Sequence, residues 1–263
     1  MKISCAGNTD VGVVRSGNED SFLLNCAGGL FIVADGMGGH AAGEVASEMA
    51  VQIVARELGT LRGLSDAEAA SKMRSAIRKA NAAIFDRTLA EHDKRGMGTT
   101  VTCLVLFETR FLIGQVGDSR AYLYRDGKLI QLTKDHSYVQ EQVDAGYLTP
   151  EQARSHPYSN VITRCVGANS DVMPDIYLGT VKLGDLFLLA SDGLTGMLED
   201  PELAEVMGGG ARDRMPQDRV DALINEANRH GGLDNITAII VRIDAVDAPV
   251  GGDTEITRPG VRD

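Results

Sequence analysis

Apolar residues in the first third of the chain change from a strand pattern to a helical pattern. Residues 30–34 form a continuous apolar run, and a glycine-rich turn follows it. Across residues 43–58 the apolar positions recur at helical spacing, which predicts a helix there. Ser65 and Glu68 then form the pattern of a capping box, so we expect a second long helix to begin at this point and to reach about residue 89.

From residue 99 onwards the apolar pattern is that of strands. Short apolar or alternating runs predict strands over 99–107, 111–116, 121–124, 128–132, 175–178, 186–190 and 236–243, in addition to two runs near the start, 11–14 and 21–24. The dipeptide Asp126-Gly127 lies between two of these strands and is typical of a hairpin turn. Two further helices are predicted over 201–206 and 218–230.

The order of these elements indicates the fold class and the domain boundaries. Strands stand before and after the pair of long helices, which favours an α+β arrangement of two sheets with helices packed outside them. Residues from about 135 to 165 are more polar, contain proline and predict a helix over 137–145 within a mobile flap. Periodicity is lost after Ala245, so we predict one domain over 1–245 and a disordered tail over 246–263.

Composition indicates a chain with a full buried core and no membrane segment. The 263 residues are 43% hydrophobic, and no apolar run approaches the roughly 20 residues that span a bilayer. The first residues lack the apolar stretch of a secretory signal, so we expect a cytoplasmic protein. The four cysteines are irregularly spaced, which favours reduced and mostly buried thiols; they are Cys5, Cys26, Cys103 and Cys165.

The charge balance argues against one class of partner. The formal net charge is -11, so a nucleic acid would be repelled. A phosphorylated substrate would also be repelled, unless bound cations neutralise several of the carboxylates. The acidity of the chain is therefore compatible with an anionic substrate only if bound metal ions neutralise part of the negative charge.

Five short acidic segments, far apart in the chain, carry the candidate chemistry. Most of them adjoin an apolar run, where a carboxylate is costly to desolvate unless a cation compensates it. The chain has no histidine pair or cysteine pair with metal-ligand spacing, and an all-oxygen site is of the kind that Mg²⁺ and Mn²⁺ prefer. The segments are Gly17-Asn18-Glu19-Asp20, Asp35-Gly36-Met37-Gly38-Gly39-His40, Gly117-Asp118-Ser119-Arg120, Ser191-Asp192-Gly193 and Asp234-Asn235.

Each segment also has an ordinary structural interpretation. Asp-Gly is a common turn dipeptide, and the glycines after Asp35 imitate a dinucleotide fingerprint, although a second long helix stands where that fold requires a strand. Glu19 and Asp20 alone would be a solvated charge pair. Arg120 is typical of a structural ion pair, and His136 of flap structure.

Taken together, the segments favour more specific roles. The short carboxylate of Asp35 can bridge two cations, with the Gly36 carbonyl beside it. Arg15 lies on the same loop as Glu19 and can grip a phosphate while Glu19 reaches a second cation. His40 lies in the glycine turn beside the proposed metals, where a general acid is needed. The remaining candidates are Asp192 and Asp234 at a sheet edge near Asp35, Asn235 as an amide that orients a ligand or a metal-bound water, and Asp118 at a further, peripheral ion.

Six motifs occur in one order along the chain. They are Arg15-x-x-Asn18-Glu19-Asp20, the segment from Asp35 to His40, Gly96-Met97-Gly98-Thr99-Thr100, Val116-Gly117-Asp118-Ser119-Arg120, Ser191-Asp192-Gly193 and Asp234-Asn235. Together they resemble the metal-dependent serine/threonine protein phosphatases, the PPM or type 2C family, in its bacterial branch. The resemblance covers residues 5 to 243, nearly the whole chain.

The resemblance implies a four-layer α-β-β-α sandwich with two central, mainly antiparallel β-sheets, a flap subdomain, and the site in the cleft between the sheets. It implies two Mn²⁺ or Mg²⁺ ions and a third ion in bacterial members. By this resemblance Asp35 would bridge the two ions, and the Gly36 carbonyl would be a ligand of one of them. Asp192 and Asp234 would be ligands of the first ion and Glu19 of the second. Asp20 would hold metal-bound waters, and Asp118 with Asp192 would bind the third ion. Arg15 would contact the substrate phosphate, and His40 would protonate the leaving group.

This interpretation predicts hydrolysis of phosphoserine and phosphothreonine in proteins, by attack of a water that bridges the two ions. The expected partners are phosphoprotein substrates and a cognate serine/threonine kinase, with the chain itself a monomer and without a nucleic acid or membrane partner. Two alternatives stay open. One is a non-catalytic member that only binds phosphoproteins, and the other is a two-metal hydrolase of small phosphoesters or nucleotides.

Overall fold

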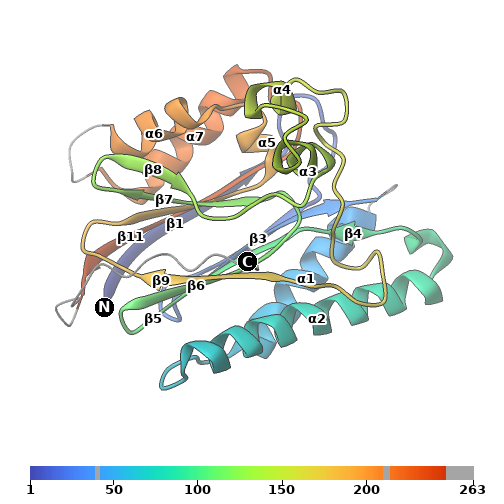
Figure 1. Ribbon diagram of the computed structural model, residues 1–263, viewed down its shortest axis with the longest axis horizontal. Coiled ribbons are helices and arrows are strands. Elements are labelled where there is room, and N and C mark those ends of the chain that lie inside the picture. Colours follow the sequence, from blue (N-terminus) through green and yellow to red (C-terminus); the bar gives the residue numbers. More distant parts are fainter. Residues whose placement is uncertain (39–41, 210–213, 247–263) are drawn as a thin grey trace.

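Two stacked antiparallel β-sheets form the centre of the protein (Figure 1). The computed structural model describes residues 1–38, 42–209 and 214–246. Sheet A has the strand order β1 (Lys2–Asp10), β11 (Ile236–Ala245), β10 (Leu186–Ala190), β7 (Arg120–Arg125), β8 (Lys128–Gln131). Sheet B has the order β2 (Asp20–Asn25), β3 (Leu30–Met37), β5 (Val101–Phe107), β6 (Arg110–Val116), β9 (Asp175–Thr180), and the short β4 (Gly98–Thr99) also pairs with β3.

Helices cover the outer face of each sheet, which makes four layers. On sheet B lie α1 (Ala42–Leu58) and α2 (Asp66–Ala90), and on sheet A lie α5 (Asp192–Thr195), α6 (Asp200–Gly208) and α7 (Pro216–Arg229) (Figure 1). One apolar core fills the space beneath each set of helices, and a third lies between the sheets. The expected α-β-β-α sandwich is confirmed.

The alternation along β11 shows how one strand serves two cores. Ile236, Ala238 and Ile240 pack beneath the helices of sheet A, whereas Ile239 and Val241 pack between the sheets. Successive side chains of a strand point to opposite faces, so a strand buried on both faces needs an apolar residue at almost every position. This requirement explains why the central strands appear in the sequence as continuous apolar runs.

Two local signals in the sequence are confirmed. Ser65 Oγ accepts a hydrogen bond from Glu68 N at 3.3 Å, and Glu68 Oε2 accepts one from Ser65 N at 2.8 Å, so the capping box starts α2. Asp126 and Gly127 have φ angles of 52° and 78°, the left-handed pair that a two-residue hairpin between β7 and β8 requires. A short 3₁₀ turn, η1 (His92–Lys94), follows α2.

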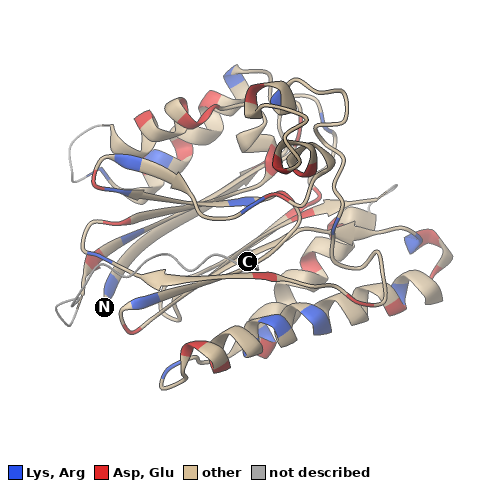
Figure 2. Ribbon diagram, in the orientation of Figure 1, with Lys and Arg blue, Asp and Glu red and all other residues tan. Residues whose placement is uncertain are grey.

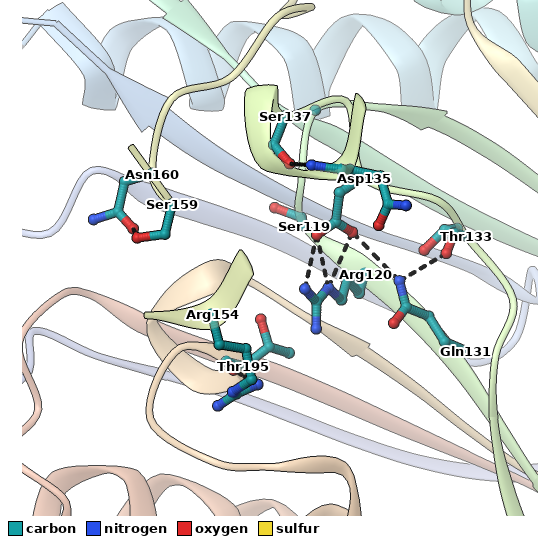
Figure 3. Close-up of polar contacts among 12 residues, drawn as sticks. Ser119, Arg120, Gln131, Thr133, Asp135, Ser137, Arg154, Ser159, Asn160 and Thr195 are labelled. Atoms are coloured by element: carbon teal, nitrogen blue, oxygen red, sulfur yellow. Dashed lines mark hydrogen bonds and ion pairs between the residues drawn. The ribbon is translucent and has the colours of Figure 1, made fainter. Parts of the chain in front are cut away.

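The segment expected to be a flap contains two short helices, α3 (Tyr138–Asp144) and α4 (Pro150–Arg154), which lie together at one end of the sandwich (Figure 1). Its base is fixed to β7 by an ion pair. Arg120 donates to both carboxylate oxygens of Asp135 at 2.7 to 3.1 Å, and both side chains are largely buried (Figure 3). The expected helix is confirmed as α3, whereas α4 was not predicted.

A second anchor of the flap is His136. Its Nδ1 accepts from Gly117 N at 3.0 Å, and its own backbone N donates to the Gly117 carbonyl at 2.9 Å. The ring is therefore held against the loop that carries Asp118. Both Arg120 and His136 have the structural contacts that their ordinary interpretation predicts.

The start of the chain differs from the prediction. The apolar pattern over 11–14 predicts a strand, but this segment forms turns, and the first strand is β1. Gly12 has a φ of 79°, and Val13 N donates to the Gly232 carbonyl at 2.8 Å, which bends the chain away from the sheet. The strand β1 lies at a sheet edge and is only half-buried, so its sequence lacks a continuous apolar run.

The expectation of four reduced thiols is also wrong. Cys5 in β1 and Cys26 immediately after β2 form a disulfide, with a Cα–Cα distance of 6.2 Å, which links an edge strand of sheet A to an edge strand of sheet B. The irregular cysteine spacing hides this pairing, because it arises only when the two sheets stack. Cys103 and Cys165 are free, and burial raises the pKa of the Cys103 thiol.

Residues 247–263, which make up nearly all of the expected tail, lie outside the described residues. Every helix in the described ranges is too short or too polar to cross a bilayer.

Candidate active site

Carboxylates from both sheets meet at the end of the sandwich near α5 and β4, where Figure 2 shows acidic positions at the ends of facing strands. Asp35 in β3 and Asp20 at the start of β2 are direct cross-strand partners. Asp118 follows β6, and Asp192 begins α5 directly after β10. Burial, and then the charge of Asp192, raises the pKa of both Asp35 and Asp118, which places these three groups in one electrostatic cluster.

Threonine groups hold the backbone of Asp35. Thr100 Oγ1 accepts from Asp35 N at 2.9 Å, while Thr100 N and Thr99 Oγ1 donate to the Asp35 carbonyl at 2.9 and 2.8 Å. Thr100 Oγ1 also lies 2.7 Å from Ser119 Oγ, the neighbour of Asp118. These bonds fix the direction of the Asp35 carboxylate and tie it to the Asp118 loop.

Asp20 is buried behind the cleft and is held by two hydroxyl groups. Ser191 Oγ and Thr237 Oγ1 donate to its Oδ2 at 2.8 and 2.6 Å. Burial raises the pKa of Asp20 to about 7, although these two hydrogen bonds oppose the shift. Asp20 thus joins β2 to the strands β10 and β11 of the opposite sheet.

Asp35 and Asp192 lie within hydrogen-bonding reach of each other. Burial raises the pKa of both carboxyl groups, and the charge of Asp192 raises that of Asp35 further. Two carboxylates this close require either a shared proton or cations around them.

Two glycines permit the close approach that the cleft requires. A Cβ at Gly193, directly after Asp192, would collide with the Asn235 carbonyl, and a Cβ at Gly36 would collide with the Gly43 carbonyl. A side chain at either position would push apart segments that carry the carboxylates. This requirement explains why Asp35 and Asp192 are each followed by glycine.

Asn235 positions the loop between β1 and β2. Its Oδ1 accepts from Glu19 N at 2.8 Å, and its Nδ2 donates to the Val11 and Gly17 carbonyls at 3.0 and 2.9 Å. These contacts of Asn235 are with the protein's own loop, and its predicted role in orienting a ligand or a metal-bound water stays a prediction. Through this loop, Asn235 sets the position of Glu19, and burial raises the pKa of the Glu19 carboxyl group.

Arg15 lies at the mouth of the cleft. Its Nη2 donates to Asp234 Oδ2 at 2.6 Å, and about half of its side chain is exposed (52%). The charges of Glu19 and Asp192 also act on it, after those of Asp234. The structure thus brings together all the expected site residues that it describes. His40 lies outside the described residues.

The cleft has the chemistry of a site for divalent cations. Asp20 Oδ1 and Asp192 Oδ1 are buried and have no hydrogen-bond partner in the described part of the chain, which is costly unless a cation satisfies them. In the described ranges, no three His, Cys, Asp or Glu side chains are already arranged to hold an ion. An ion here would therefore keep several waters, as Mg²⁺ commonly does, and with those waters the all-oxygen set fits Mn²⁺ or Mg²⁺.

The hydroxyl groups that hold the carboxylates are the part of the site that sequence analysis missed. Thr99 and Thr100 occur in one of the ordered motifs, and Ser191 adjoins Asp192, so a hydroxyl next to an acidic motif is a usable signal. Thr237 has no such signal beyond its place at the start of a strand, shortly after Asp234.

The α-β-β-α sandwich and the all-oxygen cluster of carboxylates at one end of it place this chain in a class of cation-binding proteins. In this class the carboxylates come from both sheets. The chain belongs to the protein phosphatase 2C family, whose model matches residues 15–223.

Named relatives of the chain are bacterial phosphatases. It is 38% identical over 252 residues to the serine/threonine protein phosphatase PstP of Mycobacterium tuberculosis, with 94% of this chain aligned, and it spans about half of that protein (46%). It is 38% identical to the serine/threonine phosphatase Stp of Listeria monocytogenes, over 90% of this chain and 94% of the relative. The crystal structure of the PstP catalytic domain in complex with two manganese ions superposes with a TM-score of 0.81 at 37% identity, covering 91% of this chain and 97% of that one.

Proposed function

We propose that this protein is a metal-dependent serine/threonine protein phosphatase. The observation that supports this most is the convergence of Asp20, Asp35, Asp118 and Asp192 in one cleft, with pKa values raised by burial and with two unpaired carboxylate oxygens. The printed names of relatives in the same family point the same way.

Mn²⁺ or Mg²⁺ is the proposed cofactor. Asp35 would serve both core ions, and the Gly36 carbonyl would serve one of them. Asp192 and Asp234 would complete the ligands of the first ion and Glu19 would serve the second, while Asp118 with Asp192 would take a third. When bound, the two core ions lower the pKa of a water and neutralise charge on the phosphoryl oxygens. The PstP catalytic domain, which was crystallised with two manganese ions, supports this number for the core.

The other residues of the cleft would position the substrate and the protons. Arg15 can exchange the Asp234 carboxylate for two oxygens of a phosphate, since a guanidinium binds both in the same planar geometry. Asp20, held by Ser191 and Thr237, would accept hydrogen bonds from water in the cleft. His40 would protonate the leaving alkoxide, because a serine or threonine alkoxide is a poor leaving group.

The proposed substrates are phosphoproteins, and we extend the proposal to a cognate serine/threonine kinase that opposes the enzyme. We further propose that the chain acts as a monomer in the cytoplasm. The Cys5–Cys26 disulfide stands against that compartment, because disulfides are rare in the cytosol of most organisms.

The test compares three peptides of one sequence that carry phosphoserine, phosphothreonine or phosphotyrosine. Release of inorganic phosphate is measured with Mn²⁺, with Mg²⁺ and with a chelator. We expect phosphoserine and phosphothreonine to be hydrolysed only with metal, and phosphotyrosine more slowly. Phosphopeptide binding without hydrolysis would instead indicate a non-catalytic protein, and faster hydrolysis of nucleotides or small phosphoesters would indicate the other alternative.

A further inference from the structure

Three arginines meet at the end of sheet A that lies away from α3, α4 and α5. Arg242 is near the end of β11, Arg214 lies two residues before the start of α7, and Arg219 lies in the first turn of that helix. A strand rises about 3.3 Å per residue, so Arg242 lies roughly 25 Å from Asp234, which precedes the same strand. The three residues, called here the arginine cluster, are therefore separate from the acidic cleft.

Arg219 is the buried member of the arginine cluster. Only 4% of its surface is exposed, yet its Nε has no hydrogen-bond partner among the described residues. Its Nη1 donates to the Gly209 carbonyl at 3.3 Å, a long bond. A buried N–H donor of a charged group without a partner is costly, so the position favours an acceptor beyond those that the described residues supply.

The other two arginines surround this group without neutralising it. Arg214 Nη2 donates to the Asp218 carbonyl at 3.0 Å, and Arg242 Nη1 donates to the Arg214 carbonyl at 3.4 Å. In the part of the chain that the structure describes, no ion pair joins Arg214 or Arg219 to a carboxylate. Arg242 alone pairs with one, Asp244, at 2.7 Å.

The cluster therefore has an excess of positive charge on a chain whose net charge is -11. Among the described groups, three guanidinium groups stand against the carboxylates of Asp244 and Asp218, which leaves about one positive charge. Burial, and then the charges of Arg214 and Arg242, lowers the pKa of Arg219. An anion between the three groups would remove this repulsion.

The start of α7 adds to the same site. The helix has 14 residues, and its N-cap residue, Met215, has no side-chain oxygen to accept from the first backbone N–H groups. The N-terminus of a helix carries a partial positive charge and free N–H donors, which favour an oxyanion. The Tyr124 hydroxyl lies against Gly208 at the end of α6 and interacts with the charge of Arg219, which brings a further donor to the same place.

We propose that Arg214, Arg219 and Arg242 form a second, non-catalytic site that binds a phosphate group, either as free phosphate or on a phosphorylated side chain. Guanidinium groups bind phosphate through paired hydrogen bonds, and the negative charge of a phosphate monoester complements the positive charge of the cluster. This inference does not depend on the proposed activity, because it uses no residue of the acidic cleft.

The test follows the arginine Nε–H signals of the Mg²⁺-loaded protein by ¹⁵N NMR during titration with inorganic phosphate. The signal that disappears in R219Q is assigned to Arg219. R214Q removes a second guanidinium group of the cluster at a less buried position, where the substitution should not disturb the packing of the core. R229Q is the matched control, since Arg229 lies on the same helix at its other end. A second titration uses a peptide with the non-hydrolysable phosphonate analogue of phosphoserine.

We expect a saturable shift of the Arg219 signal, an apparent Kd about tenfold weaker in R214Q, and no change in R229Q. A shift with phosphate alone would identify free phosphate as the ligand, and a shift with the peptide would identify a phosphorylated side chain. An Arg219 signal that moves with neither ligand, or that moves equally with sodium chloride at the same ionic strength, would overturn the proposal. Because the signal is local, phosphate bound in the acidic cleft does not imitate the result.

Discussion

Arg15 and Asp234 form an ion pair of 2.6 Å at the mouth of the acidic cleft, between the loop that follows β1 and the residue pair that precedes β11. The pair places a half-exposed cationic group beside the clustered carboxylates. Arg15 is the proposed contact for the substrate phosphate, and Asp234 is a proposed metal ligand. Changes to either residue should therefore separate substrate binding from metal binding.

Arg15→Ala should raise KM for phosphopeptides and lower kcat/KM by roughly 10- to 100-fold, because a charge-assisted contact to phosphate is lost. Manganese affinity, measured by calorimetry, should stay close to that of the parent protein. The control is Arg78→Ala, since Arg78 is similarly exposed (55%) and pairs with Asp171 away from the cleft. An unchanged KM in Arg15→Ala would remove this residue as the phosphate contact.

Asp35→Asn should abolish metal-dependent turnover and at the same time stabilise the metal-free protein. Burial, and then the charges of Asp192 and Asp20, disfavour ionisation of the Asp35 carboxyl group and raise its pKa, and asparagine carries no ionisable group, so we expect a higher melting temperature in chelator. Thermal unfolding with chelator and with Mn²⁺ measures both effects. Retained turnover with Mn²⁺, or a stability gain from metal as large as in the parent, would contradict the bridging role.

The metal-free protein should lose stability as the pH rises from about 4 to about 7. The pKa of Asp20 is raised by burial from 3.8 to about 7 in the folded state, so folding favours the protonated form. That contribution is fully present below the unfolded pKa and is lost through the folded pKa. Urea unfolding in chelator at pH 5 and pH 8 measures it, and Asp20→Asn should show a smaller difference between these two pH values than the parent does. An equal difference would show that Asp20 is ionised throughout.

His40→Ala should reduce turnover strongly for phosphoserine peptides and less for p-nitrophenyl phosphate, whose leaving group needs little protonation. Steady-state kinetics on both substrates provide the comparison. Equal losses on the two would exclude His40 as the general acid.

Reduction of the Cys5–Cys26 disulfide should lower the free energy of unfolding by about 3 kcal/mol, as expected for a cross-link across 21 residues. Denaturant unfolding with and without dithiothreitol measures the loss, and Cys5→Ser should show it without reductant. Alkylation of the unfolded protein should modify two thiols before reduction and four after it. Four modified thiols before reduction would instead support the prediction, made from the cysteine spacing, that all four thiols are reduced.

The sequence predicts best where one local requirement decides the structure. The run 186–190 coincides with β10 because a strand buried on both faces must be apolar throughout. The capping box at Ser65 fixes the start of α2 for a similar reason, since the helix start and the signal are the same few residues. By contrast, β1 is half-exposed at a sheet edge, and its polar residues give no continuous pattern.

The acidic motifs identify the carboxylates but not the groups that hold them. Ser191 and Thr237 meet at Asp20 only because β10 and β11 are neighbours in the folded sheet, and no spacing in the sequence encodes that meeting. The partner of Arg120 has the same origin: the sequence indicates an ion pair, and the fold selects Asp135. What depends on tertiary contact is thus absent from local patterns.

The pairing of β1 with β11 has a consequence for synthesis. Lys2 lies opposite Ala245 and Asp10 opposite Ile236, and β11 separates β1 from β10 within sheet A. While the ribosome is still adding residues, the first strand has no partner, and the apolar faces that β11 will cover stay open to other molecules. The carboxylates therefore reach their final positions only after nearly the whole domain has been released, because a nascent chain that stops short of β11 lacks Thr237, one of the two hydroxyl groups that hold Asp20.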